Sequence, residues 1–156
     1  MTYMNHLVFV DASAGELEKI LSGVKSMVLK EIDPEQPEAQ PVRPGDSLYF
    51  LRNNDECTVR VKATVVRALP REDGSDEDLS HTLKELQPRL QLTEDQFNYW
   101  STRKQALSIE FEAAHKVPEF HVAPGRITDR TRWIIFEEIR EIKEEGIKDE
   151  TGSSEQ

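Results

Sequence analysis

A chain of 156 residues suits one domain, because a chain of this size buries roughly 70% of its unfolded surface around a single core. Its longest apolar runs hold only a few residues, far fewer than the ~20 needed for a membrane-spanning helix, which excludes that class of protein. The formal net charge of −10 weighs against nucleic-acid binding, but two acidic segments, residues 70–80 and 134–156, account for nine of those ten charges and leave the rest of the chain near neutral.

The first 32 residues predict a strand, a helix and a second strand. Residues 6–10 form a short apolar run that is typical of a strand. Ser13 followed by Glu16 has the pattern of a capping box, which predicts the start of a helix, and Gly23 predicts its end. The helix carries a buried stripe at helical spacing: Leu17, Ile20, Leu21 and Val24. Residues 24–32 then predict a strand with imperfect alternation.

The middle of the chain predicts a loop followed by a β-hairpin. Residues 33–44 hold four prolines and must form a loop. Residues 47–52 predict a strand, residues 53–56 a turn, and residues 58–69 the clearest strand of the chain. In that strand apolar side chains alternate with polar ones, so one face is expected to lie on the core.

A helical insertion separates the hairpin from the closing strands. After the acidic residues 70–78, three leucines at helical spacing predict a helix that ends at Pro88. Thr93 and Gln96 form a second capping-box pattern and predict a second helix, with Trp100 on its buried face. The insertion therefore consists of two helices.

Residues 107–114 and 132–139 predict two closing strands, and residues 140–156 predict a charged helix and a disordered tail. This order has no regular alternation of strand and helix, which excludes a doubly wound parallel sheet. We expect an α+β, mainly β domain over residues 1–139, built as a small closed or half-closed β-barrel. A helix precedes its second strand, and residues 140–156 form an acidic appendage.

A few residues bear on where the protein is expected in the cell and on whether it holds a metal. Residues 1–6 lack a basic segment followed by an apolar stretch, so we expect no secretory signal and a cytoplasmic location. Cys57 is the only cysteine, which excludes an internal disulfide and a multi-cysteine zinc site, and we interpret it as a buried thiol. His115 and His121 lie six positions apart without a carboxylate pattern, so we expect neither a metal nor a cofactor.

Short motifs in the chain resemble the ASCH family of PUA-like β-barrels. Residues 20–26, Ile-Leu-Ser-Gly-Val-Lys-Ser, are similar to the family's G-x-K-x-x-E-x-R pattern at the helix-to-strand junction, with Gly23 and Lys25 in place. Lys30 stands where the arginine is usual, and Val28 replaces the usual acid. Further similarity lies in the Gly-Asp strand opening within residues 44–50 and in the closing strands at residues 106–111 and 133–136.

The resemblance implies a PUA-like barrel whose cleft, near the helix-strand junction, holds RNA or a nucleotide-like ligand. Some members of the family hydrolyse modified cytidines with a lysine in this motif, a threonine three residues later and a glutamate in the downstream helical region. Lys25 matches the lysine, but Val28 occupies the threonine position and cannot exchange a proton. Glu85 lies in the corresponding helical region. Lys25 and Glu85 are thus the candidate catalytic residues, and whether the chain is an enzyme stays open.

Two interpretations stay open for the residues of the motif itself. Lys25 is either a phosphate contact or lowered-pKa base, or a solvated lysine that interacts favourably with a helix C-terminus. The Ser26 hydroxyl is either a ligand contact or a hydrogen-bond partner of nearby backbone. The motif favours the functional interpretation for Lys25.

Further basic residues form a candidate rim around the cleft. Arg60 and Lys62 share one strand face, and a second group precedes the last strand: Arg126, Arg130 and Arg132. The alternative is that these side chains are solvated and prevent edge pairing. Trp100 and Trp133 are interpreted as core residues, with stacking on a base as the alternative.

The primary hypothesis is an RNA- or nucleotide-binding module, with Lys25, Lys30 and Arg132 lining the cleft. The first alternative is a small amidohydrolase that acts on an acylated cytidine. The second is a protein-interaction domain that uses the acidic segments. All three functions are compatible with one fold.

Overall fold

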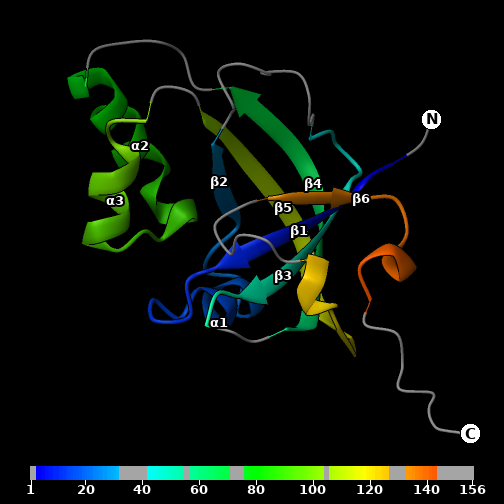
Figure 1. Cartoon of the computed structure of the whole chain (residues 1–156). Coiled ribbons are helices and arrows are strands. Elements are labelled where there is room, and N and C mark those ends of the chain that lie inside the picture. The colour runs from blue at the N-terminus through cyan, green and yellow to red at the C-terminus, as the bar shows by residue number, and fades with distance from the viewer. Residues whose placement is uncertain are drawn as a thin grey trace, which may run out of the picture.

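The fold is built around one curled β-sheet. The computed structural model describes residues 3–31, 42–54, 57–70, 76–103, 106–126 and 133–143. Within these ranges six strands form a single sheet in the order β2-β5-β4-β3-β1-β6. The strands are β1 (Asn5–Val10), β2 (Met27–Glu31), β3 (Ser47–Arg52), β4 (Thr58–Pro70), β5 (Ala106–His121) and β6 (Ile134–Phe136). β1 and β3 are parallel, and the other neighbouring pairs are antiparallel (Figure 1).

Helices lie at two places around this sheet. α1 (Glu16–Leu21) connects β1 to β2, whereas α2 (Asp76–Leu90) and α3 (Glu94–Trp100) form a helical pair beside β2 (Figure 1). Two 3-10 helices, η1 (Pro124–Arg126) and η2 (Ile139–Glu141), precede and follow β6. Among the described residues, no helix is both long and apolar enough to cross a membrane.

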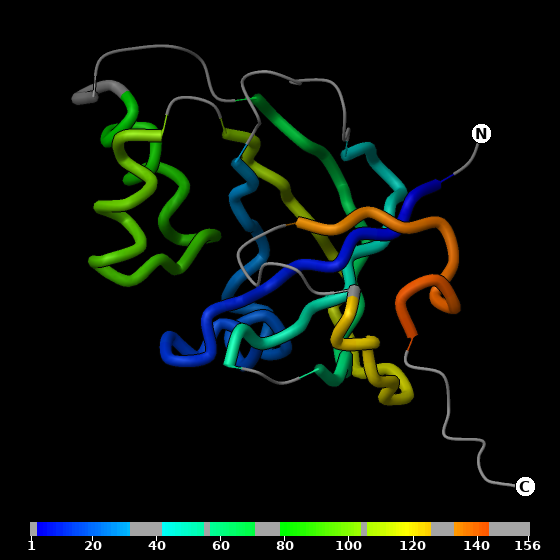
Figure 2. Tube along the Cα trace, in the orientation of Figure 1, coloured from blue at the N-terminus to red at the C-terminus, as the bar shows by residue number. Residues whose placement is uncertain are grey.

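The sheet curls until its two edge strands approach each other. β2 and β6 stand at opposite ends of the strand order, yet the ammonium group of Lys30 in β2 lies 5.8 Å from the ring centre of Trp133, the residue before β6. Figure 2 shows β6 running along β1 with its start turned toward β2. The predicted α+β, mainly β half-barrel is therefore confirmed.

The alternation of side chains along the strands divides the core into three clusters. The interior cluster fills the curl of the sheet, where members such as Val8, Phe50 and Val61 are joined by residues of α1. Met27 on the outer face of β2 packs against the helical pair, with Leu29 beside it. A third cluster covers the opposite face of β1 and β3. β2 thus lies between the barrel interior and the helical pair.

The start of α1 differs from the predicted capping box. The Ser13 hydroxyl donates to Asp11 Oδ1 at 2.6 Å, and no side chain caps the helix. The Glu16 carboxylate instead accepts a hydrogen bond from the backbone N–H of Asp11 at 2.5 Å. Val24, predicted to be buried, is 51% exposed, because it lies beyond the end of the helix.

The helical pair confirms one sequence signal and corrects another. Thr93 and Gln96 form the predicted capping box, with hydrogen bonds of 3.2 and 2.9 Å. Pro88 does not end α2, which continues to Leu90. Pro88 has no N–H to donate to the carbonyl of Lys84, four residues earlier in the helix. Both residues are exposed, so water can bind that carbonyl instead.

The closing strands differ in length from the prediction. β5 extends seven residues beyond the predicted end at residue 114, and β6 spans only Ile134–Phe136. After β6, Ile142 packs into the third cluster, and Lys143 forms a bridge with Val122. Most of the predicted loop at 33–44, the acidic residues 71–75 and the tail after residue 143 lie outside the described residues.

Candidate functional site

Lys25 lies at the junction between α1 and β2, in a conformation that the backbone fixes. Gly23 adopts a φ of +85°, which favours glycine, and turns the chain out of the helix. The backbone N–H of Lys25 donates to the Lys19 carbonyl at 3.0 Å, and that of Ser26 donates to the Arg89 carbonyl at 3.0 Å. These bonds fasten the motif to α1 on one side and to the end of α2 on the other.

The side chain of Lys25 is 1% exposed and makes two polar contacts. Its ammonium group donates to the carbonyl of Leu90, the last residue of α2, and lies 3.3 Å from Glu16 Oε2. Burial lowers the pKa of Lys25, while the charge and hydrogen bond of Glu16 oppose this and nearby Lys19 adds to it. The result is a buried ion pair at a helix C-terminus, where a cation is favourable.

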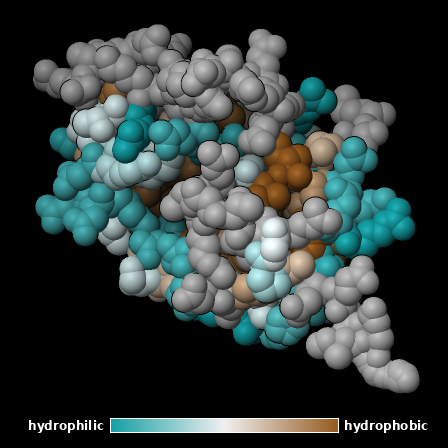
Figure 3. All heavy atoms as spheres, viewed as in Figure 1, coloured by the Kyte–Doolittle hydropathy of each residue, from teal (hydrophilic) through white to brown (hydrophobic). Residues whose placement is uncertain are grey.

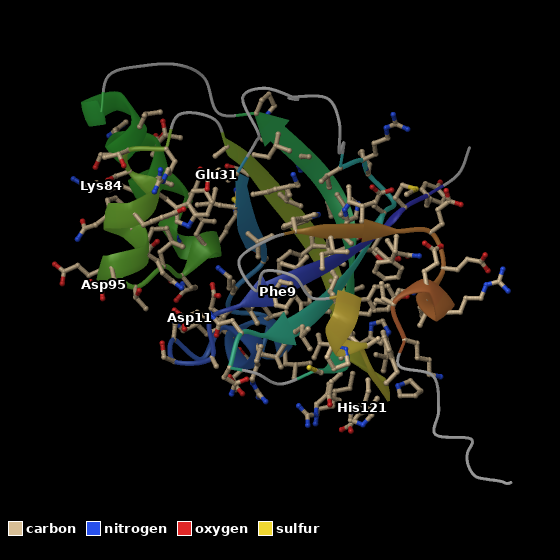
Figure 4. The ribbon with its side chains drawn as sticks, in the orientation of Figure 1. Phe9, Asp11, Glu31, Lys84, Asp95 and His121 are labelled. Atoms are coloured by element: carbon tan, nitrogen blue, oxygen red, sulfur yellow. The ribbon has the colours of Figure 1, made fainter. Side chains whose placement is uncertain are left out.

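A polar network surrounds this pair. Glu16 is held by the N–H of Asp11, and Asp11 Oδ2 accepts a hydrogen bond from Gln96 Nε2 of α3 at 3.4 Å. Figure 4 shows Asp11 at the end of β1, on the side that faces the helical pair. We call Lys25, Glu16, Asp11 and Gln96 the junction cluster, because together they join β1, α1, β2 and α3.

The structure does not bring Glu85 to Lys25. Glu85 is 67% exposed on α2 and lies 3.8 Å from His81 on the same helix. The carboxylate beside Lys25 is Glu16, because α1 and the end of α2 meet at that point. Val28 points into the interior cluster and is 7% exposed.

A second polar cluster occupies the other end of the barrel. His6 of β1 is fully buried, and its Nε2 lies 2.8 Å from Asp46 Oδ2. The Trp133 indole N–H donates to His6 Nδ1 at 2.8 Å. Asp46 also accepts hydrogen bonds from the backbone N–H groups of Met4 and Arg43, each at 3.0 Å. We call His6, Asp46, Trp133 and Lys30 the barrel-end cluster.

The hydrogen bonds fix the charge states of this cluster. Indole N–H is only a donor, so His6 Nδ1 must be the unprotonated acceptor and Nε2 carries the proton that His6 donates to Asp46. Burial lowers the pKa of His6, against the hydrogen bond and charge of Asp46, and Lys30 lowers it further. His6 is therefore neutral at pH 7, and Asp46 accepts three N–H hydrogen bonds.

Lys30 contributes the positive charge of the barrel-end cluster. It is 7% exposed, and its ammonium group lies over the face of the half-buried Trp133 ring. Burial lowers the pKa of Lys30. Among the described residues, no carboxylate pairs with it. A cation in this state attracts an anion.

The two lysines of the motif do not line one site. They are separated by five positions of extended chain, roughly 16 Å at the rise of a β-strand. Lys25 joins the helices, whereas Lys30 points into the barrel. His6 and Asp46, which lie near Lys30, belong to the predicted first strand and to the Gly-Asp strand opening, but neither was predicted as a site residue.

The remaining candidates are spread over other surfaces. Arg60 forms an ion pair with Glu119 at 3.0 Å, and the Lys62 ammonium lies 5.5 Å from the ring centre of Tyr49, in the third cluster. Ser26 is half-buried. Arg126 ends η1, and Arg130 and Arg132 lie outside the described residues. Lys62 is thus on the opposite side of the sheet from Lys30.

The visible surface near β6 is apolar. Figure 3 shows hydrophobic side chains at the surface over β6 and hydrophilic side chains over the helical pair. Ile134 and Ile135 are both half-buried. The described residues contain no group of three His, Cys, Asp or Glu side chains that suits a metal ion. The barrel end thus offers aromatic, apolar and cationic groups.

Comparison with known proteins identifies the fold. The structure is similar to the crystal structure of ASCH from Zymomonas mobilis, with a TM-score of 0.55 and 10% identity over 74% of this chain and 71% of that chain. Two mutants of that protein give TM-scores of 0.54 and 0.55, at 12% and 10% identity, over 75% of this chain in each case and 75% and 73% of theirs. No protein-family model and no curated protein matches the sequence. At these identities the likeness shows an ASCH-like fold.

Proposed function

From this ASCH-like fold, we propose that the chain binds RNA or a nucleotide-like ligand at the end of the half-barrel beside Lys30 and Trp133. The supporting observation is the Lys30 ammonium, which is buried and has no carboxylate partner among the described residues. A buried charge without a counterion is costly. A phosphate group of the ligand would supply that counterion.

Trp133 provides a surface for a base. One face of its ring lies near Lys30, and its N–H is bound to His6. Trp133 is half-buried, and we propose that its exposed part receives a planar ligand. Stacking of a base on an aromatic side chain contributes ~1 to 3 kcal/mol and tolerates any base. The combination suits a nucleotide better than a simple anion.

The segment before Trp133 belongs to the same proposal. Arg126, Arg130 and Arg132 precede this residue in the chain, and we propose that they contact further phosphates. Such contacts fix a ligand without reading its sequence. The proposal includes a cytoplasmic location and needs no metal or cofactor. Lys62, on the other side of the sheet, and Arg60, which is paired with Glu119, would contact only a ligand that extends beyond the barrel end.

The test is fluorescence-anisotropy binding of a short single-stranded RNA at several salt concentrations. Lys30→Gln is expected to weaken binding and to reduce the slope of log K against log salt by about 0.7, the value for one phosphate contact on a single strand. Lys84→Gln is the matched control, because Lys84 is an exposed lysine on α2 (Figure 4). Absence of binding at low salt, or equal effects of both substitutions, would contradict the proposal.

The junction cluster favours a second candidate, a small amidohydrolase that acts on an acylated cytidine. Its support is the lowered pKa of Lys25 beside the Glu16 carboxylate, since lowered pKa values are typical of catalytic lysines. Release of cytidine from an N4-acylated cytidine, lost in a folded Lys25→Met variant, would establish this activity. The protein-interaction alternative depends on acidic segments that lie largely outside the described residues.

A further inference from the structure

The orientation of Trp133 depends on few backbone contacts. β6, which follows it, has three residues and pairs with β1 alone among the described strands. A strand this short at the edge of a sheet holds a preceding side chain weakly. The indole also packs against the interior cluster and lies near the Lys30 ammonium. Its directional contacts are the 2.8 Å hydrogen bond to His6 Nδ1 and an edge contact with the same imidazole, whose centre lies 5.7 Å away.

His6 can accept this hydrogen bond in only one protonation state. Its Nδ1 must be free of a proton, because the indole N–H is a donor. The neutral ring then carries its proton on Nε2, where Asp46 Oδ2 accepts it at 2.8 Å. Asp46 is 2% exposed and is held by two backbone N–H groups, so the carboxylate has a fixed direction.

We propose that His6 and Asp46 are positioning residues for Trp133: Asp46 fixes the tautomer of His6, and His6 holds the indole ring in the orientation that receives the ligand. This inference rests on the proposed function for its last step. It adds two buried residues, neither of which touches the ligand, and it couples the orientation of the ring to the protonation of His6.

The charged groups near His6 determine which of its hydrogen bonds is lost when His6 is protonated. Asp46, before β3, and Lys30, on β2, are the charged groups near it among the described residues. Protonation of Nδ1 would place two N–H donors against each other across 2.8 Å. The imidazolium would keep its bond to Asp46, so the indole is the group that must move.

The first test follows the indole N–H resonances by ¹⁵N-¹H correlation spectroscopy. The chain has two tryptophans, and Trp100→Phe assigns the two indole signals. The Trp133 signal is expected to be protected from exchange with water at pH 7.5. As His6 is protonated at lower pH, the signal should shift and lose its protection relative to the intrinsic exchange rate at each pH. A signal that keeps its shift and its protection down to the lowest pH at which the chain stays folded would overturn the inference.

The second test compares two substitutions of His6. His6→Asn places an amide oxygen near the position of Nδ1 and keeps an acceptor for the indole. His6→Gln places its amide near Nε2 and keeps a partner for Asp46, but it leaves the indole N–H without an acceptor. The indole signal of Trp133 is therefore expected to stay protected in His6→Asn and to lose protection in His6→Gln.

RNA binding then distinguishes a role of His6 in orienting Trp133 from a role in stability alone. In folded variants, His6→Gln is expected to weaken binding of the single-stranded RNA about fivefold or more, the lower range for loss of one stacked base, whereas His6→Asn stays near the native affinity. His115→Gln, an exposed histidine on β5, is the control and should bind like the native chain. Equal binding by His6→Gln and the native chain would refute the inference. If the native chain binds no RNA, the proposed function fails, and the indole signal alone decides the role of His6.

Discussion

Replacement of Lys25 by methionine tests the junction cluster directly. Methionine has a similar length and fills the same buried space, so the change removes the charge and the hydrogen bonds without a large cavity. The lost contacts are the bond to the Leu90 carbonyl and the 3.3 Å pair with Glu16. Since both contacts link α1 to the end of α2, we expect a loss of stability rather than a local change.

The structure sets the size of that loss. Removal of one partner from a buried ion pair costs about 3 to 5 kcal/mol, because the other charge stays buried without compensation. Glu16 is 12% exposed and keeps its hydrogen bond from Asp11, which places the expected loss near ~3 kcal/mol. For a chain of this length that corresponds to a melting temperature lower by about 6 to 12 °C.

Urea unfolding monitored by circular dichroism measures this change. Lys84→Met is the matched control, since Lys84 is exposed on α2, and it should change the free energy of unfolding by less than about 0.5 kcal/mol. Adding Glu16→Gln to Lys25→Met should restore part of the loss, because the stranded carboxylate is then neutral. A loss below about 1 kcal/mol in Lys25→Met, with no recovery in the double variant, would refute a buried ion pair.

Three further predictions concern stability. Because the pKa of His6 is lowered in the folded chain, the stabilising contribution of His6 is present above pH 6.5 and is lost as the pH falls through the folded-state pKa. The difference in unfolding free energy between the native chain and His6→Asn should therefore shrink from pH 7.5 to pH 5. A difference that is independent of pH would contradict this prediction. Gly45→Ala should lower the free energy of unfolding by urea by about 1 to 2 kcal/mol, because Gly45 has a φ of +94° and a Cβ there would lie 2.4 Å from Tyr3 Cε1. Gly125→Ala should cost less, because a Cβ at Gly125 has no atom within 4 Å. Thr93→Ala removes the capping box of α3 and should cost about 1 kcal/mol in urea unfolding, while Thr93→Ser should keep most of that stability in the same assay.

Much of the sheet could be predicted from the sequence because its signal is local. In β4 the residues Val61, Ala63 and Val65 are all buried in the interior cluster and alternate with Lys62 and Thr64. Alternation of this kind predicts a strand with one face on the core. The capping box of α3 was predictable for the same reason, since its two partners are three residues apart. The length of β6 was not, because strand length depends on pairing with β1.

The candidate site could be predicted only in part, because its contacts are distant in sequence. Ser13 and Glu16 have the local pattern of a capping box, but the Glu16 carboxylate is bound to Asp11 and Lys25 instead. His6 was interpreted as part of an apolar strand, since its partners Asp46 and Trp133 lie 40 and 127 residues away. A single sequence carries no signal for such pairings.

The contrast between Lys25 and Lys30 decides where a ligand is expected. Both are lysines of the same short motif, and burial lowers the pKa of each. Lys25 is neutralised by Glu16 and bound to a carbonyl, so a phosphate would have to displace a carboxylate that is already in place. Lys30 has an aromatic ring beside it and no described carboxylate, so an anion would compensate its charge without displacing one. We therefore expect a phosphate to bind at the barrel-end cluster. The junction cluster can contribute acid-base chemistry or stability without binding that phosphate.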